Sequence, residues 1–342
     1  MATIDNRQLV SKITFFPSYP LYAYANGIIK DVTIDNVFGI SGSQSLSGGT
    51  ISDDIMEKIY SLISLNPSKK HYILSGSGSS LQFDLQQHTE NFYMILGHNF
   101  NESSQTVSFD YDSSTDSVNS ALSSVEYDGW SVELFENYST NTQKLEFGAG
   151  ASNFIGTVLF GQSWETPQNC DIGQTHQVSY GNKIKKTLGG KNLSTSSWNG
   201  PSKWGDLFSW ELLPHSEKDS TTGTQYGVGQ GGIRTWSVNF SQVQSKYLMS
   251  QNNMSNSYGW NQDSTSNYEV DASSDSLYNK NTGIDFYTNV YSKTMGSHLP
   301  CVVRISESNN NDQWSIVRIS DYKVTEANPK LLNISLTLEE QV

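Results

Sequence analysis

Carboxylates are the side chains of this sequence best suited to acid–base chemistry, and glycoside hydrolysis is the reaction that they would serve. That reaction needs two carboxyl groups on either side of the scissile bond, and such pairs converge from distant positions in a sequence. The candidates are Glu133, Glu136, Asp206 and Glu211. We favour the alternative interpretation, in which these side chains lie on the solvated faces of strands.

The histidines and aspartates do not have the spacing of a metal site. The sequence contains no His-Glu-x-x-His motif, no His-x-His motif and no Cys/His set at zinc spacing. His98 and His298 are each expected to make hydrogen bonds in a loop. Asp110, Asp112 and Asp116 could contribute to a calcium loop, although the glycine and the final glutamate of an EF-hand are missing. We therefore predict no metal and no cofactor.

The glycine-rich segments do not have the sequence of a phosphate-binding loop. SGSGSS at residues 75–80 and GVGQGG at residues 227–232 lack the lysine and the following helix of a P-loop. The Gly-x-Ser-x-Gly motif of a nucleophile elbow is also missing. We predict that the protein is not an enzyme.

Three tryptophans gather in residues 198–210, WNGPSKWGDLFSW. Trp198, Trp204 and Trp210 could close a sandwich as part of its core, anchor a protein interface, or form a platform on which a sugar ring stacks. All three interpretations stay open. Loss of glycan binding on replacing each tryptophan by alanine would support the third.

The composition excludes several classes of protein. The chain has 342 residues, of which 16% are charged and 35% hydrophobic, and its net charge is -13. A nucleic-acid groove needs clustered Lys and Arg, and a bilayer span needs about 20 apolar residues, so we expect neither partner. The basic cluster Lys183, Lys185 and Lys186, with Lys191 nearby, is interpreted as a solvated face.

The sequence also predicts the redox state and the compartment. MATIDNRQLV does not have the basic and apolar segments of a secretory signal, so we expect folding in a reducing cytosol. Cys170 and Cys301 are therefore expected to remain thiols, with Cys301 buried in a strand.

Hydrophobic alternation predicts strands along much of the chain. Leu81, Phe83 and Leu85 alternate with polar residues, so one face of that strand should be buried. Residues 92–96, FYMIL, are apolar throughout, so both faces of that strand should be covered, and a short loop is expected between the two. Residues 331–338 again alternate, which predicts a long strand with one wet face.

Helix signals are few. Residues 52–65 are the best candidate, because Ser52 can cap, Asp53 and Asp54 suit the first turn, and the apolar residues have helical spacing. Shorter helices are expected over residues 243–249 and 286–295. The sequence thus predicts an all-β fold with a few short helices.

We expect this pattern to form two β-sandwich domains. Residues 1–150 are predicted to form the first, with the helix near 52–65, and residues 151–342 the second, with long loops at 214–232 and 250–276. The segment FGAGASN at residues 147–153 is a plausible seam.

Two resemblances add to these predictions. LQFDL at residues 81–85, leading into NFYMILGHNF at residues 91–100, resembles the discoidin or galactose-binding-like β-sandwich. The second half is similar to a tail-tube-like module of phage structural proteins. Its landmarks are GTVLFG (156–161), WGD (204–206), GGIRTWSVNFSQV (231–243), GSHLPCVVRI (296–305), NNNDQWSIVRI (309–319) and NISLTLEEQV (333–342).

The resemblance implies a structural subunit of a tailed bacteriophage, of the distal-tail or baseplate type. Such a protein would form a homo-oligomeric ring, with six-fold symmetry for a distal tail protein, and would dock to other virion proteins. It would be located in the virion and assembled in the cytoplasm of the host bacterium. The alternatives are a head decoration or neck protein, and a carbohydrate-binding module that recognises a host-surface glycan.

Overall fold

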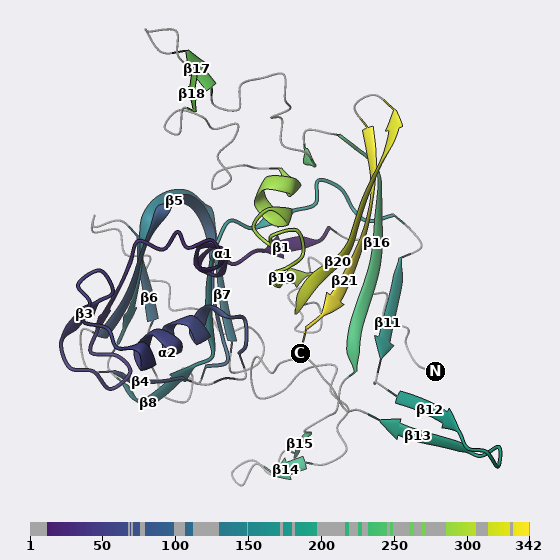
Figure 1. Cartoon of the computed structure of the whole chain (residues 1–342), viewed down its shortest axis with the longest axis horizontal. Helices are drawn as coiled ribbons and strands as arrows, with labels where there is room; N and C mark the ends of the chain where they lie inside the picture. The colour runs from purple at the N-terminus through teal and green to yellow at the C-terminus, as the bar shows by residue number, and fades with distance from the viewer. Residues whose placement is uncertain are drawn as a thin grey trace.

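The computed structural model describes residues 12–67, 69, 71–75, 79–98, 107–111, 130–148, 150–171, 174–179, 182–196, 216–218, 225–227, 232–244, 247–248, 260–262, 268–270, 285–305, 314–328 and 331–341. Antiparallel strands dominate these residues (Figure 1). The helices are α1 (Tyr19–Ala25), α2 (Asp53–Ile63) and the short π-helix η2 (Tyr287–Tyr291). The predicted all-β fold with a few short helices is confirmed.

The first sheet has the strand order β3-β2-β5-β7-β6, and β9 also pairs with β5. Its strands are β2 (Asp31–Asp35), β3 (Ser43–Ser45), β5 (Ser79–Leu96), β6 (Val107–Tyr111), β7 (Trp130–Phe147) and β9 (Thr157–Gly161). Beside it, β4 (His71–Ser75) pairs with β8 (Gly150–Ile155). The two long strands bend so that the sheet folds over its own core, and the rings of Tyr93 and Phe109 stack 4.0 Å apart inside it (Figure 1).

Helix α2 occupies the segment predicted for the longest helix. Its apolar face enters the core of the first sheet through Ile59 and Leu62, both fully buried. Ser52 lies at the N-cap position, but its side chain makes no capping hydrogen bond. The first turn holds Asp53 and Asp54, which the positive end of the helix dipole favours.

Strand β5 is continuous, so the loop predicted before residue 92 is wrong. The strand runs from Ser79 to Leu96, with register shifts between Asp84 and His88 and between Glu90 and Phe92. The alternation predicted over residues 81–85 is confirmed, and residues 92–96 are all buried as expected. The segment between them stays in the strand through its pairing with β7, and two of its polar side chains, those of His88 and Glu90, bind each other.

The second sheet has the order β10-β1-β19-β20-β21-β16-β11. Its strands are β1 (Thr14–Phe16), β10 (Trp164–Glu165), β11 (Thr175–Ser179), β16 (Ile233–Gln244), β19 (Cys301–Arg304), β20 (Trp314–Asn328) and β21 (Leu331–Glu340). Burial alternates along β21, which confirms the wet face predicted for residues 331–338. Strand β16 continues through Gln244, so the helix expected from residue 243 is wrong at its start. The helix expected over 286–295 is present as η2 followed by turns.

Three hairpins complete the described elements. They are β12 (Asn182–Lys186) with β13 (Asn192–Ser196), β14 (Ser216–Lys218) with β15 (Gln225–Gly227), and β17 (Trp260–Gln262) with β18 (Tyr268–Val270). The predicted long loops at 214–232 and 250–276 fall largely outside the described residues, apart from the short strands of the last two hairpins.

The two sheets exchange elements along the chain. Strand β1, from the N-terminal end, pairs with β10 and β19 in the second sheet. Strand β9, which follows residue 150, pairs with β5 in the first. The division of the chain at residues 150 and 151 stays a prediction.

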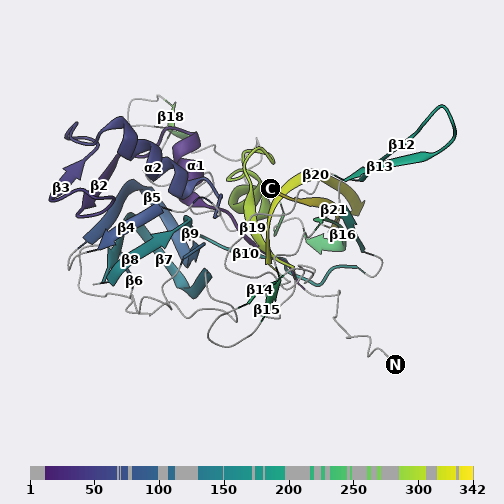
Figure 2. The same cartoon turned by 90° about the horizontal axis from the view of Figure 1, so that it is seen from below.

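A separate apolar cluster joins the two sheets, which lie side by side (Figure 2). Phe92, Met94 and Leu96 point out of the first core and pack in this cluster with Trp314 of the second sheet. Phe16 stacks on Trp314 with ring centroids 5.1 Å apart. Strand β5 is apolar over residues 92–96 because one of its faces fills the first core and the other fills this junction.

Candidate functional site

Several of the site residues expected from the sequence lie outside the described residues. These are Trp198, Trp204 and Trp210, and the carboxylates Asp206 and Glu211. The tryptophan cluster therefore stays a prediction in all three of its interpretations. Glu133 and Glu136 lie on β7, half-buried and exposed respectively.

The calcium hypothesis is also not tested. Asp112 and Asp116 lie outside the described residues, and of Asp110 only the backbone, in β6, is described. Across the part of the chain that the structure describes, no three His, Cys, Asp or Glu side chains gather where they could hold a metal ion.

The predictions for single histidines and for the cysteines have a clear outcome. His98 is buried and its Nε2 lies 2.7 Å from the Ser131 hydroxyl, which confirms a hydrogen-bonding role. His298 is exposed. Cys170 and Cys301 are both buried thiols, and burial raises the pKa of each to about 12.

A buried polar cluster that the sequence did not reveal lies where β5 meets the second sheet. His88 and Glu90 have no exposed surface, and His88 Nε2 lies 2.5 Å from Glu90 Oε1. Nδ1 of His88 lies 2.9 Å from the carbonyl oxygen of Gln86, so this nitrogen must carry a proton and donate it. The contact between Nε2 and Oε1 is then a second hydrogen bond, in which one of these two atoms donates.

The same cluster contains two groups from elsewhere in the chain. Tyr19, at the start of α1, stacks on His88 with ring centroids 3.8 Å apart and planes 5° apart. The ammonium nitrogen of Lys293, which follows η2, lies 5.7 Å from the centre of the Tyr19 ring and 2.9 Å from Asn289 Oδ1. Burial lowers the pKa of Lys293 to about 7, although the nearby charge of Glu90 raises it.

This cluster connects the two sheets. His88 and Glu90 belong to the first sheet, and Lys293 lies 2% exposed in the turns that cover the second. Because these polar groups are buried and come from both parts of the structure, we interpret the cluster as a contact that fixes how the two sheets meet. The signal in the sequence was weak: residues 86–91 are polar, yet they contain neither Gly nor Pro to end the strand.

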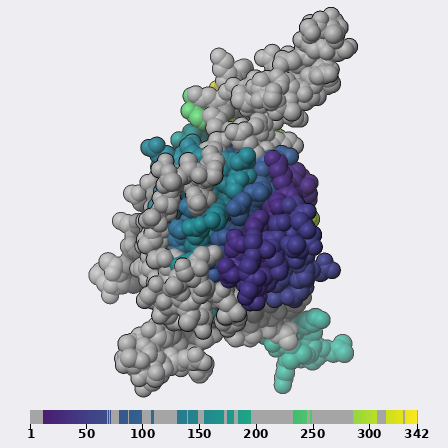
Figure 3. Space-filling model, turned by 90° about the vertical axis from the view of Figure 1, so that its left-hand side faces the viewer, coloured from purple at the N-terminus to yellow at the C-terminus, as the bar shows by residue number. Residues whose placement is uncertain are grey.

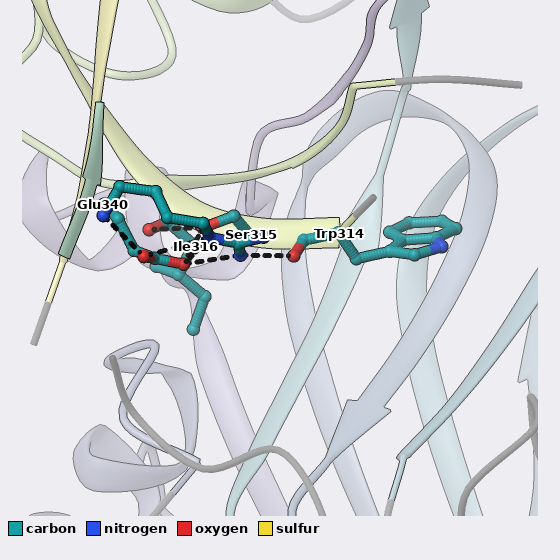
Figure 4. Close-up of polar contacts among 5 residues, drawn as sticks. Trp314, Ser315, Ile316 and Glu340 are labelled. Carbon is teal, nitrogen blue, oxygen red and sulfur yellow. Dashed lines mark hydrogen bonds and ion pairs between the residues drawn. The ribbon is translucent and has the colours of Figure 1, made fainter. Parts of the chain in front are cut away.

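A buried ion pair ties three strands of the second sheet together. Arg234 on β16 donates to the Glu340 carboxylate from Nε at 3.0 Å and from Nη2 at 2.6 Å. Glu340 also accepts from the Ser315 hydroxyl at 2.6 Å, as Figure 4 shows beside Trp314. Arg234 Nη2 donates further to the Trp314 carbonyl oxygen at 3.0 Å. Because both buried charges have several hydrogen-bonding partners, we interpret the Arg234–Glu340 pair as a structural contact between the strands.

The exposed surface holds a different feature, the hairpin β12–β13. It stands clear of the body in two views at right angles, and its teal-green atoms project from the lower right of the space-filling view (Figures 1, 2 and 3). Ile184 and Leu193 are 67% and 61% exposed, and Leu188 at the turn is fully exposed. The turn is closed by hydrogen bonds between Thr187 and Lys191, with Gly190 at positive φ.

The basic residues noted in the sequence belong to this hairpin. Lys185, Lys186 and Lys191 are exposed, as the interpretation of a solvated face expects. Lys183 lies on β12, and its side chain is not described. Preceding the hairpin, β11 is an edge strand of the second sheet, and all five of its residues are exposed.

Comparison with known proteins adds little to this geometry. No family model matches the chain, and no curated protein matches it. A pectin-binding carbohydrate-binding module is similar over 30% of this chain and 78% of its own, with 12% identity and a TM-score of 0.26. A truncated AlyQ with CBM32 and alginate lyase domains is similar over 56% of each chain, with 14% identity and a TM-score of 0.24. Neither similarity is close enough to assign a fold or a function to this chain. Among the described helices, none is long and apolar enough to cross a membrane.

Proposed function

We propose that the protein is a non-enzymatic structural subunit that acts by docking to neighbouring proteins in a larger assembly. The observation that carries the proposal is the hairpin β12–β13, with Ile184, Leu188 and Leu193 exposed. A two-stranded hairpin alone is marginally stable in water, and exposed aliphatic side chains on it are expected to be covered by a partner.

The core of the molecule supports the same proposal. A docking subunit must hold its shape, and the two sheets share an apolar junction that includes Phe92, Met94 and Trp314. The Arg234–Glu340 pair and the cluster around His88 add polar contacts with specific geometry. An apolar interface with such contacts favours one fixed arrangement of the two sheets over relative motion.

A tailed-phage particle is the assembly that the sequence resemblance suggests, with the tail tip or baseplate as the place. Electron microscopy of the purified protein, and of particles that contain it, tests this. A six-fold ring would support a distal-tail role, and trimers or single copies on a capsid lattice would indicate a head decoration protein. A protein that stays monomeric and binds no particle component would contradict the proposal.

A further inference from the structure

The hairpin β12–β13 differs sharply in charge from the rest of the chain. Residues 182–196 contain four Lys and no Asp or Glu. Residues 1–161 contain 17 Asp and Glu and 7 Lys and Arg, which gives 7 - 17 = -10. A strongly basic projection and a strongly acidic N-terminal part are thus present in one molecule.

The hairpin presents basic and apolar groups on both of its faces. Directly paired residues of an antiparallel ladder lie on the same face, so Lys185 shares a face with Leu193. Ile184 lies on the opposite face with Lys186, because successive residues of a strand alternate. Leu188 adds an apolar tip. A partner that covers this hairpin must therefore offer carboxylates next to apolar surface.

The first sheet with its helices offers exposed carboxylates. They lie on α2 and on β7 and are Asp53, Glu57 and Glu136, together with Asp54 and Glu146, which form ion pairs with Lys58 and Lys144 of the same molecule. The hairpin of the same molecule does not meet them, because it projects from the second sheet on the side away from the first (Figure 2). Any carboxylates of a first sheet that the hairpin contacts must therefore belong to another molecule.

We infer that the hairpin β12–β13 docks on the acidic N-terminal part of a second copy of this chain. The inference rests on the proposed assembly function and names the partner of the same site. The contact is head-to-tail, since it joins two different surfaces, and its repetition closes into a ring or extends into a filament. Ion pairs between lysines and carboxylates orient the contact, and the aliphatic side chains are buried by it.

Cross-linking of mixed copies tests the contact directly. Natural-abundance and ¹⁵N-labelled protein are mixed, and a carbodiimide condenses lysine amines with nearby carboxyl groups. We expect links from Lys185, Lys186 or Lys191 to carboxylates within residues 1–161, in peptide pairs that combine both isotopes. The inference would be overturned if the hairpin lysines were linked only to carboxylates of their own copy. It would also be overturned if they were linked only to carboxylates within residues 232–341.

A pair of charge-reversal variants supplies the matched control. Lys185→Glu/Lys186→Glu should weaken self-association in sedimentation by about tenfold, because two exposed ion pairs become repulsive. Arg318→Glu/Lys323→Glu reverses two exposed charges on β20 and should leave association unchanged. Circular dichroism checks that both variants are folded. Wild-type association should also weaken with salt.

The outcomes separate the inference from the proposed function. If the wild-type protein and the hairpin variant assemble equally well, the hairpin contact is refuted. The proposed assembly function would then depend on another surface. If wild type is monomeric yet binds other particle components, the second copy is refuted as the partner. If it does neither, the proposed function is refuted as well.

Discussion

Replacing Lys293 by methionine should stabilise the protein near neutral pH and remove part of its pH dependence. Lys293 is 2% exposed, and its ammonium group has Asn289 Oδ1 as a hydrogen-bond acceptor. Burial lowers its pKa from 10.5 to about 7. The nearby charge of Glu90 acts in the opposite direction and raises the pKa, but by less than burial lowers it.

The direction of the effect follows from proton binding. The unfolded chain keeps the Lys293 proton up to a pH of about 10.5, and the folded chain releases it near pH 7. The unfolded state therefore binds more protons between these values, and the free energy of unfolding rises with pH across the window. Below pH 7 Lys293 is protonated in both the folded and the unfolded state, and its buried charge then lowers the free energy of unfolding most.

The size of the effect follows from the pKa difference. A shift of 10.5 to about 7 corresponds to about 5 kcal/mol over the whole window, of which about 2 kcal/mol falls between roughly pH 7 and pH 9. Methionine has nearly the same length and no charge. Loss of the hydrogen bond to Asn289 offsets part of the gain, so we expect Lys293→Met to be more stable by roughly 3 kcal/mol near pH 7.

Urea unfolding at the two pH values, followed by tryptophan fluorescence, measures both quantities. The difference between wild type and variant should shrink by about 2 kcal/mol from the lower pH to the higher, because other titrating groups cancel in the comparison. Lys323→Met, at an exposed position of β20, is the control and should show no such change. If the free energy of unfolding changed with pH by the same amount in wild type and in Lys293→Met, the low pKa assigned to Lys293 would be refuted.

Three further perturbations test other parts of the structure. Glu340→Gln leaves the buried Arg234 guanidinium without its counter-charge, so the free energy of unfolding in urea should fall by about 3–5 kcal/mol. A decrease no larger than that of a surface substitution would contradict the role of the ion pair. Gly156→Ala places a Cβ against the backbone carbonyl of Pro67 and should lower the melting temperature strongly, whereas Gly189→Ala, in the open turn of the hairpin, should change it little. Both cysteines should react with a thiol reagent at pH 8 only after unfolding, because burial raises each pKa to about 12. Full labelling before the unfolding transition would show that they are accessible.

The sequence predicted the local patterns of the fold well. Alternation over residues 81–85 and 331–338 translates directly into one buried face, because side chains of a strand point to opposite sides in turn. The apolar run at residues 92–96 was correctly interpreted as covered on both faces. The structure shows that the second sheet covers one of these two faces.

Features that depend on distant parts of the chain were not predictable in this way. Residues 86–91 read as a loop, because nothing local indicates that His88 and Glu90 would pair inside a strand beside Tyr19. Lys293 reads as a surface lysine, and its burial depends on a junction built from both sheets. The hairpin was recognised only as a basic cluster, because the pairing of residues 182–186 with 192–196 has no alternating pattern.

The position of β1 between β10 and β19 has a consequence for biosynthesis. Strand β1 is synthesised long before β19, the strand with which it pairs, since Thr14 and its hydrogen-bonding partner Arg304 are 290 residues apart in sequence. The sheet around the buried Phe15 and Phe16 can therefore close only after β19 has been translated. A chain that stops before residue 301 lacks β19, the strand that pairs with all three residues of β1, so we expect chaperones and proteases to recognise such truncated products.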